Sequence, residues 1–270
     1  MDAPGEVKRH LELYVKYFVI FWKTRLIYRT DFVLGFTAQL LNLVASLAFL
    51  TLIFTQVESI QGWTFNEMLF LAGFGGLVLN LHHIFFFSLY SLGDDYIITG
   101  RMDRFLVRPL HPLFQVFASK VSDDNLSKFL ANIAVLMYAA SQIGVNLLTP
   151  AKLFYGFFAI LSGVMIFGSI FLALSSLGFW AGRSKPLFWF FFQISNFRKY
   201  PYGIYSVPIK IILVTLLPIA FAAFFPATFF LEKGSWGLWQ LAALVAGPVF
   251  YLLAYQVWRV GLSTYSSTGS

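Results

Sequence analysis

The residues that could do chemistry inside the apolar part of this chain form two largely polar stripes, each with a spacing of three or four residues. In sequence order they are Gln39, Asn42, Ser46, Asn80, His83 and Phe87. This spacing places each set on one face of an α-helix. Because lipid would leave the polar groups without hydrogen bonds, these faces should turn towards other helices or towards a path through the membrane. Hydrogen bonding between helices and lining of a substrate path both fit the pattern.

The sequence shows neither a set of catalytic side chains nor a motif for nucleotide binding and hydrolysis. The chain has no Cys, and its 12 acidic residues all lie outside the long apolar runs. It lacks a G-x-x-x-x-G-K-[ST] phosphate-binding loop, so it cannot hydrolyse a nucleotide alone. His82 and His83 are adjacent and would point about 100° apart on a helix, which favours a packing or hydrogen-bonding role over a metal site. We therefore expect no catalytic residue, no metal site and no cofactor bound by this chain.

Six apolar runs supply the elements that must position the two stripes. Of the 270 residues, 59% are hydrophobic and 11% are charged, whereas globular domains usually carry about 25% charged residues. About 20 apolar residues in a helix cross a hydrocarbon core of about 30 Å. The pattern predicts an all-α membrane protein with six transmembrane helices. The expected spans cover about 32–57, 68–93, 129–151, 153–182, 208–231 and 236–258.

The basic residues sort to one side of such a bundle. If all six runs span, 16 of the 19 Lys and Arg residues lie in segments 1–31, 94–128, 183–209 and 259–270. Two lie on the opposite side, and Lys210 lies at a boundary. The positive-inside rule then places both termini in the cytoplasm. The formal net charge of +7 is explained by this topology, so we expect the lipid bilayer as a partner and no nucleic acid.

Three further segments are expected near the membrane surface. Residues 5–29 carry apolar side chains at helical spacing and a basic face, which predicts an amphipathic interfacial helix within a cytoplasmic domain at 1–31. Residues 186–197 are intensely aromatic but too few to span, so they should lie in the interface or dip in and return. Residues 224–239, which include Pro226, are expected to contain a short helix in the outer leaflet.

Two motifs resemble a known family. The segment Gly100–Leu110 reads G-R-M-D-R-F-L-V-R-P-L and resembles the G-x-x-D-x-x-L-x-R-P-L loop of ABC-2-type transporter permeases. The second motif runs from Tyr200-Pro201 to Pro226 and resembles that family's Y-P … P … I-P-x-A-F … P pattern. Leu217 departs from it, since Ile or Val is more usual there. With six spans and this length, the likeness covers essentially the whole chain.

The resemblance implies an ABC-2 (type V exporter-like) permease fold in a bacterial inner membrane. Such a permease is the transmembrane subunit of an ATP-binding cassette exporter, and it would pair with a second permease, identical or related. Two separate ATPase subunits would bind ATP and Mg²⁺. The path would run along the first, second and fifth spans, with Phe221 joining the two stripes. Its aromatic walls would suit an amphiphilic or lipid-like substrate.

The resemblance also assigns the ATPase contact. The loop 94–128 would carry a coupling helix at about 94–106, and 1–31 would be the connecting helix beside it. A membrane channel or scaffold protein without ATP coupling is the alternative interpretation. The expected coupling residues are Asp94, Asp95, Tyr96, Gly100, Asp103, Arg104, Arg108 and Pro109.

Overall fold

A computed structural model describes residues 29–119 and 124–266, and these ranges are helical without strands. Most of the predicted 1–31 domain, including nearly all of its amphipathic helix, lies outside the described residues. The longer elements are α2 (Arg29–Phe54), α3 (Phe65–Phe86), α6 (Asp124–Ile143), α7 (Pro150–Ser176), α9 (Lys185–Ser195) and α13 (Gly237–Thr264). The shorter ones are η1 (Phe87–Ser91), η2 (Leu92–Ile97), α4 (Asp103–Leu106), α5 (Pro112–Ser119), α8 (Gly178–Ala181), η3 (Asn196–Lys199), η4 (Tyr202–Ile204), α10 (Val207–Ile212), α11 (Ile219–Ala222) and α12 (Phe224–Phe230).

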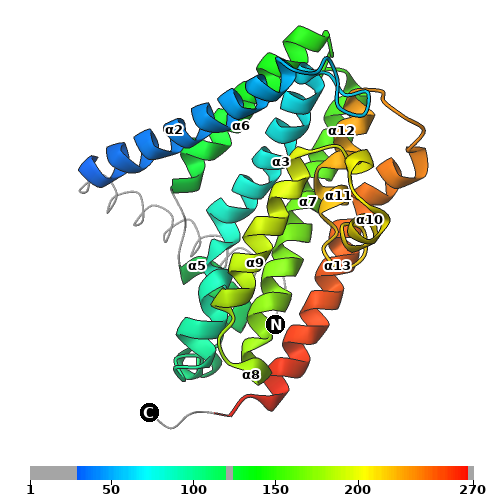
Figure 1. Ribbon diagram of the computed structural model, residues 1–270. Helices are drawn as coiled ribbons and strands as arrows, with labels where there is room; N and C mark the ends of the chain where they lie inside the picture. The colour runs from blue at the N-terminus through cyan, green and yellow to red at the C-terminus, as the bar shows by residue number, and fades with distance from the viewer. Residues whose placement is uncertain (1–28, 120–123, 267–270) are drawn as a thin grey trace.

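Five of the described helices are long and apolar enough to cross a membrane. They contain α2, α3, α6, α7 and α13, and they overlap the predicted spans 32–57, 68–93, 129–151, 153–182 and 236–258. The second extends through η1 and η2 to Ile97, and the fourth extends through α8 to Ala181. In Figure 1, α7 and α13 run side by side, whereas α2 leans away from the bundle.

A serine holds the α7–α13 pair together where α13 contains Pro248. The Ser162 hydroxyl donates to the carbonyl oxygen of Ala243 at 2.5 Å and accepts from the Gly247 N–H at 2.8 Å. The hydroxyl thus lies between the Gly247 N–H and the Ala243 carbonyl, which would otherwise form a hydrogen bond with each other within α13. Proline disturbs helical hydrogen bonding nearby, and a side chain from a neighbouring helix satisfies the freed groups, as membrane interiors require.

The two ends of the bundle are tied by different contacts. The upper end in Figure 1 holds the 55–64 loop, and two ion pairs there connect α3 and α7 to the turn before α13. Lys233 Nζ lies 2.6 Å from Glu67 Oε2, and Lys152 Nζ lies 2.9 Å from Glu232 Oε1. The lower end holds the residues that join η2 to α5.

The predicted fifth span, 208–231, is not one helix. It is divided into α10, α11 and α12 by breaks at Leu213–Pro218 and at Ala223. Pro218 lacks an N–H and its ring clashes with a preceding helical turn, which accounts for the first break. The remaining helical stretch, Ile219–Phe230, would extend only about 18 Å and is shorter than a span. The α12 part of 224–239 is buried in the bundle rather than lying on its surface.

The predicted cytoplasmic segment 183–209 instead runs along the bundle. α9 begins at the lower end, where its first residues contact Asp94. After α9 the Arg198 side chain packs beside Gly75 in the middle of α3. Farther on, Gly203 faces the side chain of Gln61, and Tyr202 contacts Trp236, both at the upper end. Residues 186–197 therefore neither lie along the interface nor return to the end where they entered.

An aromatic cluster explains why α9 follows this course. Phe188 and Phe191 lie on one face of α9 and are buried. Their rings contact Phe171 of α7 at centroid distances of 4.9 and 5.6 Å, in edge-to-face geometry. Phe171 also meets the His83 ring of α3 at 5.5 Å. Close packing of this kind drives helix association in a membrane, where lipid already surrounds apolar groups.

The α7–α13 contact generates a test of the fold. A Cβ added at Gly247 would collide with the backbone carbonyl of Ser162, which cannot turn away. We expect Gly247→Ala to destabilise the protein by about 1–3 kcal/mol and to lower its unfolding midpoint in detergent, followed by tryptophan fluorescence. Gly237→Ala is the matched control, since it meets nothing within 4 Å at the start of the same helix. Equal midpoints for the two variants would contradict this packing.

Candidate functional site

A cavity of about 660 Å³ lies between α2, α3, α6 and η3. Five of the seven residues predicted for a substrate path line it, from both stripes. They are Gln39, Asn42, Ser46, Asn80 and His83. The structure thus brings the stripes of two helices to one space, on the side of α3 where α2 leans outward (Figure 1). Its apolar wall comes largely from α2 and α6, including Leu43, Leu47, Leu130 and Val135.

Glycines on α3 set the shape of this cavity. An added Cβ at Gly73 would lie 3.1 Å from the backbone nitrogen of Leu136, and one at Gly76 would collide with the side chain of Asn132. α3 and α6 therefore approach closely at this level, as small residues allow. The Asn80 amide donates to the Gly76 carbonyl at 2.7 Å within its own helix. A larger residue at either glycine would push α6 away and change the cavity.

Three basic side chains that sequence reasoning missed also line the cavity: Lys128, Arg198 and Lys199. Arg198 Nη1 donates to the carbonyl oxygen of Ser195 at 2.7 Å, at the end of α9. Its stem has room because Gly75 has no side chain; a Cβ there would lie 3.3 Å from Arg198 Cγ. Gly75 is ten residues from the upper end of α3, or about 15 Å along its axis. Arg198 therefore lies well inside the bundle.

Phe87 and Phe221 do not line the cavity. The regular α-helix ends at Phe86, and the Phe87 ring contacts the ring of His83, its neighbour in the stripe, at 5.1 Å. It also stacks on Tyr90 at 5.4 Å. Phe221 lies in α11, where its ring contacts Phe225 at 5.1 Å and Trp239 at 5.8 Å. The structure places these two predicted path residues in packing positions.

Two of the three predicted acidic coupling residues, Asp94 and Asp95, bind the start of α9. The Asp94 carboxylate accepts hydrogen bonds from the Ser184 N–H at 2.9 Å, the Ser184 hydroxyl at 2.8 Å and the Lys185 N–H at 3.0 Å. A carboxylate in this place satisfies free N–H groups and complements the positive end of the helix dipole. Asp95 Oδ1 accepts from Lys185 Nζ at 2.8 Å, and this hydrogen bond raises the pKa of Lys185. η2 and the start of α9 are therefore joined.

Of the remaining coupling residues, Tyr96 lies in η2, and the others belong to a folded loop at the lower end, residues 98–109. Gly100 adopts φ of 71°, which favours glycine at this turn. Asp103 Oδ1 accepts from the Tyr265 hydroxyl at 2.9 Å, and the Arg104 guanidinium lies 5.3 Å from the centre of the Tyr96 ring. Burial and the hydrogen bond to Asp103 raise the pKa of Tyr265 to about 12.

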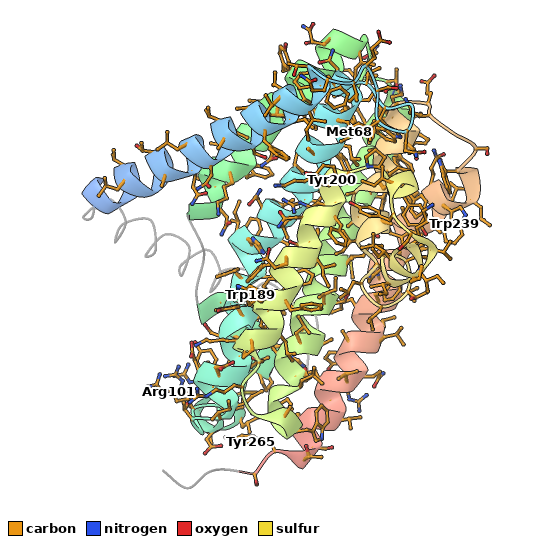
Figure 2. All side chains as sticks on the ribbon, in the orientation of Figure 1. Met68, Arg101, Trp189, Tyr200, Trp239 and Tyr265 are labelled. Carbon is orange, nitrogen blue, oxygen red and sulfur yellow. The ribbon has the colours of Figure 1, made fainter. Side chains whose placement is uncertain are left out.

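The 98–109 loop also has an exposed face. Arg108 and Pro109 are exposed, and Val107 between Leu106 and Arg108 is 83% exposed. Figure 2 shows Arg101 pointing away from the helices at the same end, not far from Tyr265. Gln115 supports the loop from α5, where its amide donates to the carbonyls of Phe105 and Leu110 at 2.8 and 2.9 Å. The predicted residues thus divide into those that hold the loop and those that face outward.

α9 connects the loop end to the cavity. Its first turn is bound to η2 through Asp94, and η3 at its other end places Arg198 and Lys199 in the cavity wall. Within the described part of the chain, no three His, Asp or Glu side chains gather as a metal site would require. The arrangement offers a ligand space beside α3, which α9 connects to the lower end.

Residues 40–269 match the model of a protein family described as ABC-2 family transporter protein. The match covers all but the first 39 residues and the last one, and it includes α3, α6, α7, α9 and α13. No curated protein and no solved structure matches the chain.

The Asp94 contact can be tested by removing its carboxylate. Asp94→Ala would leave three donors at the start of α9 without their acceptor, and we expect a loss of about 1–3 kcal/mol in the free energy of unfolding. Asp95→Asn is the matched control, because its ion pair with Lys185 is 41–43% exposed and such pairs contribute about 0–1 kcal/mol.

The ion pair between Asp95 and Lys185, which the control variant lacks, should depend on pH. Because the pKa of Lys185 is raised in the folded state, the contribution of the pair is complete at neutral pH and is lost as the pH rises through that raised value. Unfolding midpoints of the wild type and of both variants, measured from pH 6 to pH 11, test the cost of Asp94→Ala and the pH dependence of the Asp95–Lys185 pair. If Asp94→Ala were no more destabilising than Asp95→Asn, Asp94 would not anchor α9.

Proposed function

This chain belongs to the ABC-2 family of transporter proteins, and we propose that it forms the substrate path of an ATP-binding cassette exporter and couples that path to separate ATPase subunits. As a family member it is a multi-pass membrane protein and a permease subunit of an ABC transporter. The observation that carries the proposal is the connection from the exposed 98–109 loop through Asp94 and α9 to the cavity.

In the proposed assembly, two partner ATPases bind ATP and Mg²⁺ and contact the 98–109 loop. The exposed Leu106, Val107 and Arg108 would enter a groove on the ATPase surface. Asp103 and Arg104 would hold the loop in shape through Tyr265 and Tyr96. Since this chain has no phosphate-binding loop, all the energy for transport would come from these partners.

Closure of the ATPases would press on the loop and shift η2. Because Asp94 bonds to the first turn of α9, the shift would pass to that helix and move Arg198 at its far end. The cavity would then change its shape and its affinity between two conformations. Only a ligand or motor that binds one conformation more tightly can move such an equilibrium.

The walls of the cavity support an amphiphilic or lipid-like substrate. α2 and α6 supply leucines and alanines to the wall, and amide, imidazole and basic groups reach it from α2, α3, α6 and η3. A second permease, identical or related, would pack beside this one, and α2 offers a long exposed face that either the partner or lipid can cover. We place the complex in a bacterial inner membrane with the lower end and both termini in the cytoplasm, following the positive-inside rule.

The loop contact is tested with a variant that leaves the fold alone. Leu106→Glu combined with Val107→Glu changes exposed side chains only, so we expect normal expression and an unchanged unfolding midpoint. Co-purification of a P-loop ATPase and transport-coupled hydrolysis should fall at least about tenfold, since two charges would be buried in an apolar contact. Ser263→Glu, an exposed site at the end of α13, is the control. A double variant that retains coupled hydrolysis would remove this loop from the contact, and a wild-type chain that brings down no ATPase would favour a channel or scaffold.

A further inference from the structure

We propose that the cavity between α2, α3, α6 and η3 recognises an anionic group, so that its ligand is an amphiphile with an acidic head and an apolar chain. The inference deepens the proposed function and rests on it for calling this ligand the transported substrate. The binding itself needs no ATPase.

The charges that line the cavity are all positive. Lys128, Arg198 and Lys199 contribute to its wall, and no Asp or Glu does. Among the described residues, Arg198 and Lys199 take part in no ion pair; the described pairs are Lys152–Glu232, Lys185–Asp95 and Lys233–Glu67. A cation inside a membrane protein is costly unless it is paired or solvated, and such residues commonly mark a ligand path. An anionic ligand would supply a counter-charge for Arg198 and Lys199.

Arg198 is suited to hold such a head group. One of its nitrogens, Nη1, is occupied by the Ser195 carbonyl, which fixes the guanidinium at the end of α9. Its Nε is buried and has no hydrogen-bond partner among the described residues. A guanidinium presents several N–H donors in one plane and binds the oxygens of carboxylates and phosphates in pairs. The side chain is therefore positioned by the protein while donor capacity remains.

Some of the other lining residues would contact the head of the ligand, and the rest would contact its apolar chain. Asn80 and His83 lie one and two turns below the level of Gly75, on the cavity face of α3. Leu43 and Leu47 of α2 and Leu130 and Val135 of α6 form the apolar wall. An inorganic anion would use the basic groups but leave this wall in contact with water. The apolar wall favours an amphiphile over a free phosphate.

The test uses the purified full-length chain in a neutral maltoside detergent. The probes are one fluorescent acyl chain with a phosphate head, the same chain with a phosphocholine head, and the same chain with a trimethylammonium head. We expect the phosphate probe to bind at least about tenfold more tightly than the other two, because a charge-assisted hydrogen bond to a buried group accounts for a factor of that size. Inorganic phosphate at millimolar concentration should compete only weakly.

Arg198→Gln should weaken binding of the phosphate probe about tenfold and leave the phosphocholine probe unchanged. Lys199→Gln, at a site without the bond to Ser195, gives a second variant if Arg198→Gln does not fold, and Arg198→Lys should restore part of the affinity. Arg259→Gln on the exposed surface of α13 is the matched control. Each variant is first compared with the wild type by its unfolding midpoint.

The inference is overturned if folded Arg198→Gln or Lys199→Gln binds the phosphate probe as the wild type does, or if the wild type prefers the neutral or cationic probe. If inorganic phosphate displaces the probe at micromolar concentration, the claim that the ligand is an amphiphile is wrong, and the cavity is a site for small anions. Probe binding that needs Arg198, in a protein that never assembles with an ATPase, would instead contradict the proposed function and support the binding site.

Discussion

Helix α9 is fixed at both of its ends, and this constraint sets the relation between the lower loop and the cavity. At its start, one carboxylate oxygen of Asp94 accepts three hydrogen bonds from Ser184 and Lys185. Beyond its end, Arg198 fits beside Gly75 and donates to the last turn through Ser195. Between them, Phe188 and Phe191 pack against Phe171 of α7. Without this packing, a helix as short as α9 would be expected to lie at the membrane surface.

The same constraint gives the cavity its charge. Because α9 and η3 rise along the bundle, Arg198 and Lys199 reach the cavity that Asn80 and His83 of α3 also line. The cavity combines apolar side chains of α2 and α6 with polar side chains from all four elements. Electrostatic interactions are stronger there than in water, so unpaired cations at this depth bias the cavity towards anionic ligands. The contact that organises the fold and the contact that would select the ligand thus belong to one segment.

Much of this organisation is present in the amino-acid sequence. The absence of charge over long runs predicts α2, α3, α6, α7 and α13, and the spacing of polar residues predicts five that meet in one cavity. The family resemblance carried by Gly100–Leu110 agrees with the match over residues 40–269. These features are local, because hydrophobicity and periodicity can be evaluated within a single helix.

The features that sequence reasoning missed depend on contacts between distant segments. Residues 186–197 are too short to span alone, and nothing local indicates that they pack on Phe171 or continue into η3. Arg198 and Lys199 then look like ordinary loop cations in a charge count, although they lie inside the bundle. Pro218 signals a break, but it does not indicate that α11 and α12 fold back into the upper half.

Cysteine accessibility tests the course of α9 and η3 most directly, and the chain simplifies it by containing no Cys. Single substitutions Val107→Cys and Ile204→Cys place thiols at exposed sites before and after this segment. In bacterial spheroplasts with an intact inner membrane, a membrane-impermeant maleimide should label Ile204→Cys directly. It should label Val107→Cys only after permeabilisation. If both thiols react only after permeabilisation, residues 183–209 lie on one side of the membrane, and the proposed link from the loop to the cavity is wrong.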